Sequence, residues 1–415
     1  MKRFIITDLE DAKKVNHCNG CFGCFFKDPG RCILNDECKD QGQKIGHCEE
    51  IILISRLTFG GYSRIAKKRF DRSLPFVHGD FHIFHGQMHH KGRYENDPTL
   101  KVYFYGPGTD NEKENAKILV ERNSYNLALN KYETYFCDTA KQAMEMANVT
   151  INDLYDYDLD ITADEISVED KNENLNIAIL NGSPRGTKGA SGSVCAELRN
   201  RILQISKENT VLDDEIVTEY LENPQLDNCL QRKVDVYEYD LVGDSLKECL
   251  SMDEIGKLCN ADWMIFIFPL YLDSPSSNLQ ACLEDMVAIR EKFRGAKVSC
   301  IALAGLYEGV QTETAIRIMK YWSKEMGFEF IKGSGFGGSG SLPGLKKIMP
   351  GEGIKKGLLE LYDEIIMANE KGKSLENSYK SIGMTLKDYQ ESCEGAFRGI
   401  AAKNGFSLED MGKQW

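Results

Sequence analysis

A strand, a loop and a helix follow one another at residues 175–193, and this stretch constrains the fold more than any other part of the sequence. The apolar run NIAIL has the length of a buried strand, and a helical pattern begins at about Val194. The loop between them is rich in Gly, Ser and Thr and about twice as long as the usual connection of two to six residues. Because a helix N-terminus offers N–H groups and a positive dipole end, this layout favours a bound phosphate over an ordinary connection.

Two familiar phosphate-binding motifs are absent from this loop. It lacks GxxxxGK[ST], which excludes a nucleoside-triphosphate loop, and it lacks GxGxxG, which excludes a dinucleotide fingerprint. The stretch NGSPRG followed by SGS instead resembles the signature of the NADPH-dependent FMN reductase and iron–sulfur flavoprotein family. The resemblance implies bound FMN, with NAD(P)H as electron donor. The implied phosphate site comprises Ser183, Pro184, Arg185, Ser191, Gly192 and Ser193, where Gly192 replaces the usual Asn.

Composition narrows the class of protein. The 415 residues suffice for two domains, and the net charge of −13 argues against nucleic acid or an anionic membrane as a partner. No apolar run reaches membrane-spanning length, and the first residues do not form a signal-peptide pattern. Fourteen Cys without an export signal predict a cytoplasmic protein whose clustered thiols bind metal rather than form disulfides.

Strands alternate with helices along most of the chain, which predicts a parallel α/β sheet. We expect a flavodoxin-like doubly wound sheet in two tandem units, of which the first is incomplete. The predicted strands cover 2–7, 51–55, 100–105, a stretch near 135, 175–181, 233–241, 262–268, 297–304 and 328–332. The predicted domains are an incomplete unit with a Cys-rich loop (1–149), an acidic linker (150–174), a complete FMN-binding domain (175–370) and a helical tail (371–415).

The two units look like a diverged internal repeat. SRLTFGGYSRIAKKRFDR aligns with FPLYLDSPSSNLQACLEDM, and both resemble the PxY…K…DR segment of the family. The first copy keeps Lys67, Asp71 and Arg72, whereas the second has Gln280 and Met286 in place of the Lys and Arg. The first unit starts at what should be its second strand, so its own strands would leave the sheet without its central member. The unit then either borrows a strand or forms a modified sheet. We therefore expect a pseudo-dimer within one chain, with one FMN site; further homo-oligomerisation is compatible with this.

The flavin ring is expected where the third and fourth strands of the second unit end. There the N–H groups of Leu270, Tyr271 and Leu272 can bond the pyrimidine side of the ring, as in an oxyanion hole. The competing interpretation is a strand-terminating turn with a core Tyr. The expected ring contacts are Pro269, Leu270, Tyr271, Leu272, Asp273 and Ser274, with Gly305 as a third wall. No catalytic residue can be assigned.

A second candidate site is the pattern C-x2-C-x2-C-x7-C, formed by Cys18, Cys21, Cys24 and Cys32. Closely spaced cysteines with one more distant ligand are typical of [4Fe–4S] sites, and the motif resembles that of iron–sulfur flavoproteins. Zinc bound by four thiolates is an alternative. Thiols that line the edge of a cofactor are another. Cys38 and Cys48 are spare thiols that could replace the fourth ligand.

Two further stretches carry weaker signals. The His-rich segment from His78 to His90 is expected to be a solvated or interface loop rather than a metal site. The glycine-rich segment Gly333–Gly344 is expected to be a flexible loop over the flavin.

The sequence predicts an FMN-dependent NAD(P)H oxidoreductase that reduces a flavin, a quinone or an electron carrier. Its electrons would pass through the iron–sulfur cluster to a small-molecule or protein acceptor. The alternatives are a non-enzymatic electron carrier, an FMN reductase without a cluster, and a degenerate scaffold that has lost flavin.

Overall fold

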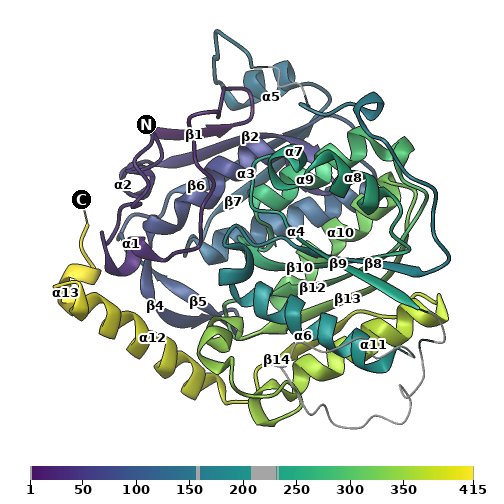
Figure 1. Cartoon of the computed structure of the whole chain (residues 1–415). Coiled ribbons are helices and arrows are strands. Elements are labelled where there is room, and N and C mark those ends of the chain that lie inside the picture. Colours follow the sequence, from purple (N-terminus) through teal and green to yellow (C-terminus); the bar gives the residue numbers. More distant parts are fainter. Residues whose placement is uncertain (1, 156–158, 207–229, 231–232, 415) are drawn as a thin grey trace. The chain divides into compact units, whose positions relative to one another are not determined.

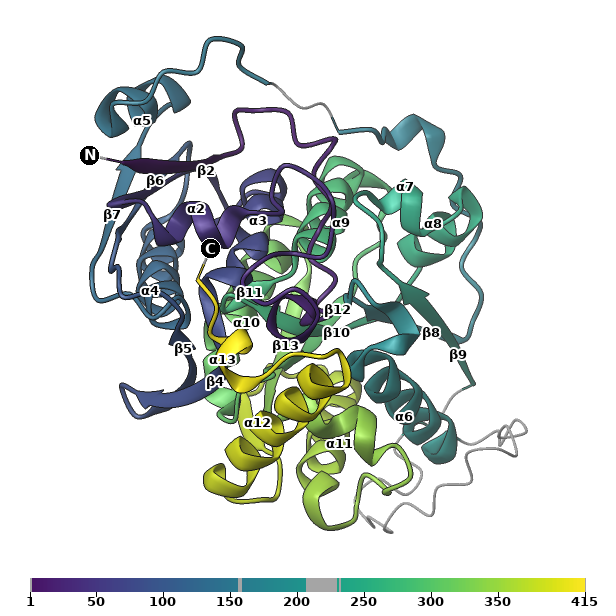
Figure 2. The ribbon, with the colours of Figure 1, turned by 90° about the vertical axis from the view of Figure 1, so that its left-hand side faces the viewer.

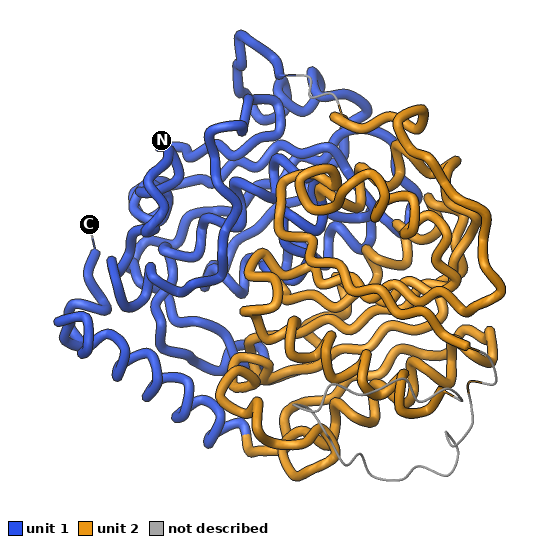
Figure 3. Tube along the Cα trace, in the orientation of Figure 1, with its two compact units in different colours: residues 1–158, 271–280, 386–415 blue, residues 159–270, 281–385 orange. Residues whose placement is uncertain are grey.

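A computed structural model describes residues 2–155, 159–206, 230 and 233–414. The chain divides into two compact units (Figure 3). Unit 1 comprises Met1–Asp158, Tyr271–Gln280 and Leu386–Trp415, and unit 2 comprises Leu159–Leu270 and Ala281–Thr385. The predicted domain boundaries at 149, 174 and 370 remain predictions. No helix in the described part of the chain is both long and apolar enough to cross a bilayer.

Unit 2 is built on a parallel sheet whose strand order is β9-β8-β10-β12-β13-β14 (Figure 1). Numbered along the chain, the first five strands give the order 2-1-3-4-5, which is the flavodoxin-like order. This confirms the predicted fold class. The strands are β8 (Leu175–Asn181), β9 (Val234–Asp240), β10 (Trp263–Tyr271), β12 (Lys297–Leu303), β13 (Glu329–Gly337) and β14 (Ser378–Ser381).

The central strands of this sheet are buried on both faces, which explains their continuous apolar sequences. Two helices, α6 (Ala190–Ile205) and α11 (Lys356–Lys371), pack together, and Arg201 of α6 pairs with Asp363 of α11 at 2.8 Å. The later residues of α9 (Ser277–Ala288) adjoin α10 (Glu313–Glu325), where Trp322 Nε1 donates to the carbonyl of Leu283 at 3.0 Å (Figures 1 and 2). Between β9 and β10 lie α7 (Leu246–Cys249) and α8 (Met252–Cys259).

Unit 1 contains a smaller parallel sheet of order β1-β2-β6-β7. These strands are β1 (Arg3–Thr7), β2 (Glu50–Thr58), β6 (Thr99–Tyr105) and β7 (Tyr132–Cys137). The expected gap at the centre of this sheet is wrong, because β1 pairs directly with β2 along its whole length. Among the described residues of this unit, no edge strand is equivalent to β9, and the Cys-rich stretch occupies that place in the sequence. Its helices include α1 (Gly23–Phe26), α2 (Gln41–Gly46), α3 (Arg64–Phe70), α4 (Asp110–Asn126) and α5 (Ala140–Ala147).

The proposed internal repeat has the same local structure in both copies. Strand β2, the short β3 (Gly61–Tyr62) and helix α3 match β10, the short β11 (Ser274–Pro275) and helix α9. Each copy turns through two residues at positive φ, as in a type I′ hairpin turn. They are Phe59 (53°) and Gly60 (74°) in the first copy, and Leu272 (47°) and Asp273 (54°) in the second.

The His-rich segment forms a hairpin rather than the expected loop. Its strands are β4 (Val77–Phe84) and β5 (Gln87–Gly92), with His82 opposite His89. Helix α12 (Leu386–Lys403) borders β4, where Glu394 accepts a hydrogen bond of 3.0 Å from the N–H of Phe81. The C-terminal region is also less helical than expected, because β14 precedes α12 and the short α13 (Leu408–Met411).

Part of the glycine-rich segment is a buried strand, so the expectation of a flexible loop is wrong for residues 333–337. Strand β13 runs through Gly337. A Cβ at Gly335 would lie 2.1 Å from Oγ1 of Thr312, and one at Gly337 would lie 2.0 Å from the carbonyl oxygen of Tyr307. Glycine here permits close packing of β13 against the connection that follows β12.

Candidate functional site

The loop between β8 and α6 is held by side chains from two strands. Asp240, at the end of β9, accepts hydrogen bonds from Asn181 Nδ2 at 2.7 Å and from the N–H of Thr187 at 3.3 Å. The side chain of Asn181 in turn accepts from the N–H of Ser183 at 3.2 Å. A short 3₁₀ turn at Gly186–Lys188 completes the loop. The loop is therefore ordered by its own contacts, before any ligand is considered.

The N-terminus of α6 has two features that suit an anion. Its N-cap residue is Gly189, and no described side chain caps the first turn. Ser191 in that turn is only 1% exposed, and its Oγ has no hydrogen-bond partner among the described residues. An unsatisfied buried hydroxyl costs about 1–3 kcal/mol, so a ligand that accepts a hydrogen bond from Ser191 would remove that cost. These residues fit a phosphate group.

The other predicted phosphate contacts differ in exposure. Ser183 is buried and its Oγ accepts from the N–H of Arg185 at 3.2 Å, whereas the Arg185 side chain is exposed. Pro184 and Ser193 are half-buried. A Cβ at Gly192 would lie 2.5 Å from Cα of Thr187. This loop conformation therefore leaves no room for a side chain at position 192.

The loop shares its edge of the sheet with the ends of two further strands. Neighbours β8, β10 and β12 are parallel, so their carboxyl ends lie at the same edge. Pro269 in β10 pairs with Leu303 in β12, and the exposed Gly305 follows β12 with open space where a Cβ would be. The structure thus brings Pro269, Leu270 and Gly305 to the same edge as the phosphate loop.

The turn after β10 belongs to unit 1. Side chains of α3 and α4 donate hydrogen bonds to its carbonyl groups. Lys67 Nζ donates to the carbonyl oxygen of Tyr271 at 2.9 Å, and Asn123 Nδ2 donates to that of Leu272 at 2.6 Å. Ser274 Oγ also donates to the Tyr271 carbonyl, at 3.2 Å. The peptide groups of this turn are therefore fixed in orientation. Their expected contact with a flavin ring remains a prediction.

A buried acid follows in the same turn. Asp273 is 2% exposed, and burial raises its pKa to about 6 although Asn126 donates to its carboxylate. Sequence reasoning missed Asn123 and Asn126. The sequence pattern that could have identified them is a pair of Asn residues three positions apart, because such residues lie on the same side of a helix.

Of the four motif cysteines, Cys24 is buried, Cys18 and Cys32 are half-buried, and Cys21 is exposed. Burial, together with the other motif thiols, raises the pKa of Cys24 well above its ordinary value. No three His, Cys, Asp or Glu side chains in the described part of the chain are arranged to hold a metal ion. The four thiols do lie close enough to affect one another's pKa. The metal site predicted at Cys18, Cys21, Cys24 and Cys32 stays a prediction.

The cysteine segment contacts the turn after β10. Gly20 (φ 58°) packs so closely on Tyr271 that a Cβ would lie 2.0 Å from the Tyr271 hydroxyl oxygen. The two spare thiols are buried, and desolvation raises the pKa of Cys38 and of Cys48 to about 11. In the His-rich hairpin, burial lowers the pKa of His89 to about 4 and that of His90 to about 3, so both are neutral.

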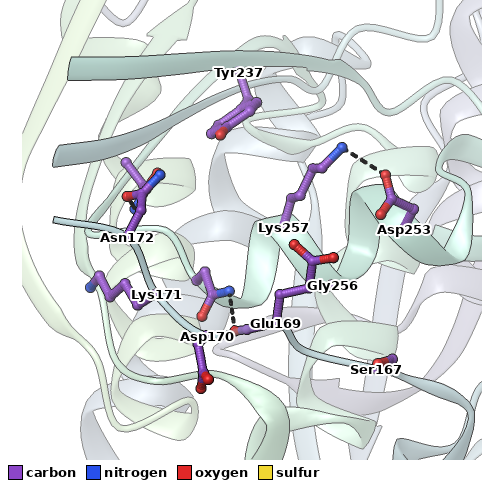
Figure 4. Close-up of a pocket in the computed structure, with 11 residues that line it drawn as sticks. Ser167, Glu169, Asp170, Lys171, Asn172, Tyr237, Asp253, Gly256 and Lys257 are labelled. Carbon is purple, nitrogen blue, oxygen red and sulfur yellow. Dashed lines mark hydrogen bonds and ion pairs between the residues drawn. The ribbon is translucent and has the colours of Figure 1, made fainter. Parts of the chain in front are cut away.

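A small polar pocket of about 100 Å³ lies elsewhere in unit 2 (Figure 4). Its lining includes Asn176 near the start of β8, and Lys257, which pairs with Asp253 at 2.7 Å. The start of β8 is at the opposite edge of the sheet from the phosphate loop. This pocket, which sequence reasoning did not anticipate, is therefore separate from the candidate phosphate site.

Comparisons with known proteins add little. No protein-family model matches the chain. No curated protein matches it. A solved structure, the flavodoxin, WrbA-like protein from Agrobacterium tumefaciens, is 12% identical and covers 48% of this chain and 97% of its own, with a TM-score of 0.29. This similarity is too weak to carry an argument, so the flavodoxin-like assignment depends on the strand order itself.

Proposed function

We propose that this chain is an FMN-dependent oxidoreductase that takes electrons from NAD(P)H and passes them to a small-molecule or protein acceptor. The observation that carries the proposal is the unpartnered, buried Oγ of Ser191 at the uncapped N-terminus of α6. This helix follows the first strand of a flavodoxin-like sheet, and its N-terminus lies at the switch point where such sheets bind ligands.

Each part of the loop has a separate role in this proposal. Ser191 and the N–H groups of the first turn of α6 hold the phosphate, and Ser183 shapes the loop. Asp240 bonds the loop from β9 and fixes its conformation. Bound FMN supplies one- and two-electron redox chemistry at its ring. We infer that the ring lies beside Pro269, Leu270 and Gly305.

The cysteine motif has no step in this proposal. Its four thiols do not form a metal-binding group in the described conformation. Iron and acid-labile sulfide should be counted in anaerobically purified protein. A protein with FMN and about four iron atoms per chain would support the iron–sulfur hypothesis.

The phosphate site can be tested by titrating the full chain with FMN and with riboflavin, which lacks the phosphate, while following flavin fluorescence. We expect FMN to bind at least about tenfold more tightly than riboflavin, and Ser191→Ala to weaken FMN alone by about tenfold. Ser206→Ala is the matched control, because Ser206 ends the same helix and donates to the carbonyl of Leu203. Equal affinity for the two flavins would contradict the phosphate site.

The oxidoreductase activity needs its own assay. The FMN-loaded protein should oxidise NADH or NADPH in the presence of a quinone, and Ser191→Ala should require more FMN to reach the same rate. Turnover that is absent with all small acceptors would favour the electron-carrier alternative. Failure to bind either flavin would contradict the proposed function as a whole.

A further inference from the structure

Two cysteines in unit 2 face each other although they are 33 positions apart. Cys249 ends α7 and Cys282 lies in α9, and their Sγ atoms are 3.7 Å apart. A disulfide requires about 2.05 Å between sulfurs, so the two Sγ atoms would have to approach each other by roughly 1.7 Å. Cys282 is fully buried, whereas Cys249 is partly exposed.

The local backbone supports a reactive sulfur at Cys249. Its Sγ accepts a hydrogen bond of 3.1 Å from the N–H of Gly243, in the connection between β9 and α7. A Cβ at Gly243 would lie 3.3 Å from that sulfur and 2.6 Å from Cβ of Glu248, so glycine permits the close approach. Hydrogen bonds from Cys282 and from Gly243 lower the pKa of Cys249, which increases its thiolate fraction.

Two carboxylates oppose a lasting negative charge at this sulfur. Glu248 accepts from the N–H of Asp244 at 2.8 Å, and Asp285 accepts from the N–H of Leu246 at 2.7 Å, so both are fixed near the thiol pair. Both carboxylates raise the pKa of Cys249, whereas its hydrogen bonds lower it. Formation of a neutral disulfide removes this repulsion, which favours the oxidised pair.

We propose that Cys249 and Cys282 form a redox-active dithiol that reacts with low-molecular-weight disulfides. The Cys249 thiolate attacks one sulfur of the small disulfide, forming a mixed disulfide and releasing one thiolate. Cys282 then attacks Cys249 Sγ and its proton passes to the departing sulfur, so the Cys249–Cys282 bond forms and the second thiol is released. The protein loses two electrons, and the small disulfide is reduced to two thiols.

The test uses the full chain equilibrated at graded ratios of reduced to oxidised glutathione, followed by alkylation and tryptic digestion. Cys249 then lies in the fragment 248–257, and Cys282 lies in 258–290 together with Cys259. A Cys259→Ala background makes the assignment unambiguous. We expect the two fragments to become disulfide-linked at oxidising ratios and to separate again when reduced glutathione is added.

Single variants identify the attacking sulfur. Cys282→Ser should lose the link and retain glutathione on Cys249, whereas Cys249→Ser should slow reaction at Cys282 by at least about tenfold. Absence of the linked fragments at every ratio would overturn the proposal. Equal reactivity of Cys282 with and without Cys249 would overturn the assigned order of attack. This test does not depend on flavin binding.

Discussion

Lys67 Nζ donates a hydrogen bond of 2.9 Å to the carbonyl oxygen of Tyr271, 204 positions later in the sequence. The same lysine pairs with Asp71, whose other carboxylate oxygen accepts from the N–H of Ser277 at 3.1 Å. One buried ion pair from the first copy of the repeat therefore fixes the turn and the helix start of the second copy. The second copy has the uncharged Gln280 at the position aligned with Lys67.

Removing the charge of Lys67 should destabilise the protein strongly. Lys67→Met leaves the carboxylate of Asp71 buried and unpaired, and we expect the free energy of unfolding to fall by about 3–5 kcal/mol in urea titrations. The double variant Lys67→Met/Asp71→Leu should recover much of the loss, because neither charge remains. A single variant as stable as the parent would show that this pair contributes little.

Asp273 should make stability depend on pH. Burial raises its pKa from 3.8 to about 6, so its favourable contribution is complete below about pH 3.8 and is lost as the pH rises through 6. Asp273→Asn removes this dependence and keeps an acceptor for Asn126. The variant should gain stability relative to the parent between pH 4 and pH 8, by roughly 2–3 kcal/mol.

Thermal unfolding at several pH values measures this difference. Asp138→Asn is the control, because Asp138 is exposed. A difference between Asp273→Asn and the parent that stays constant from pH 4 to pH 8 would contradict the raised pKa.

Two glycines in helices should respond in opposite ways to alanine. Gly192→Ala in α6 places a Cβ 2.5 Å from Thr187, and the overpacking should cost about 1–3 kcal/mol and weaken FMN binding. Gly395→Ala in α12 meets nothing within 4 Å and should stabilise the protein by about 0.5–1 kcal/mol. Urea titrations of both variants measure the contrast, and a stabilising Gly192→Ala would contradict the loop conformation.

The glycines of β13 should also prove to be packing residues. Gly335→Ala would force a Cβ against Thr312 and the carbonyl of Gly309, so a loss of about 1–3 kcal/mol in the free energy of unfolding is expected. Gly344→Ala, in the same glycine-rich segment, has open space and should change stability by no more than about 0.5 kcal/mol. Similar small effects at both positions would restore the flexible-loop interpretation.

The sequence predicted the sheet of unit 2 because its central strands are continuous apolar runs, as burial on both faces requires. It could not predict β14, whose sequence SYKS is polar and joins the sheet edge through backbone pairing with β13. The hairpin of β4 and β5 had a signal, since Val77, Gly79 and Phe81 alternate with polar residues, but the histidines suggested a loop.

The candidate site was predictable only in part. The hydroxyl-rich loop after β8 identified Ser191, but its burial depends on how the loop folds over α6. The anchor Asp240 comes from the end of another strand, and the pairing of Cys249 with Cys282 joins two helices. Such contacts between distant positions leave no local pattern in a single sequence.

Unit 1 is made of three separate segments of the chain, and this has a consequence for its synthesis on the ribosome. Its sheet is made from the first strands of the chain, yet it also contains Tyr271–Gln280 and Leu386–Trp415. Buried Arg93 donates to the carbonyl oxygens of Met411 and Lys413, at 2.5 and 3.1 Å. Unit 1 therefore begins before unit 2 in the sequence and is completed after it. A nascent chain that stops before residue 386 leaves β4 without α12, and leaves Arg93 without the carbonyl groups of Met411 and Lys413.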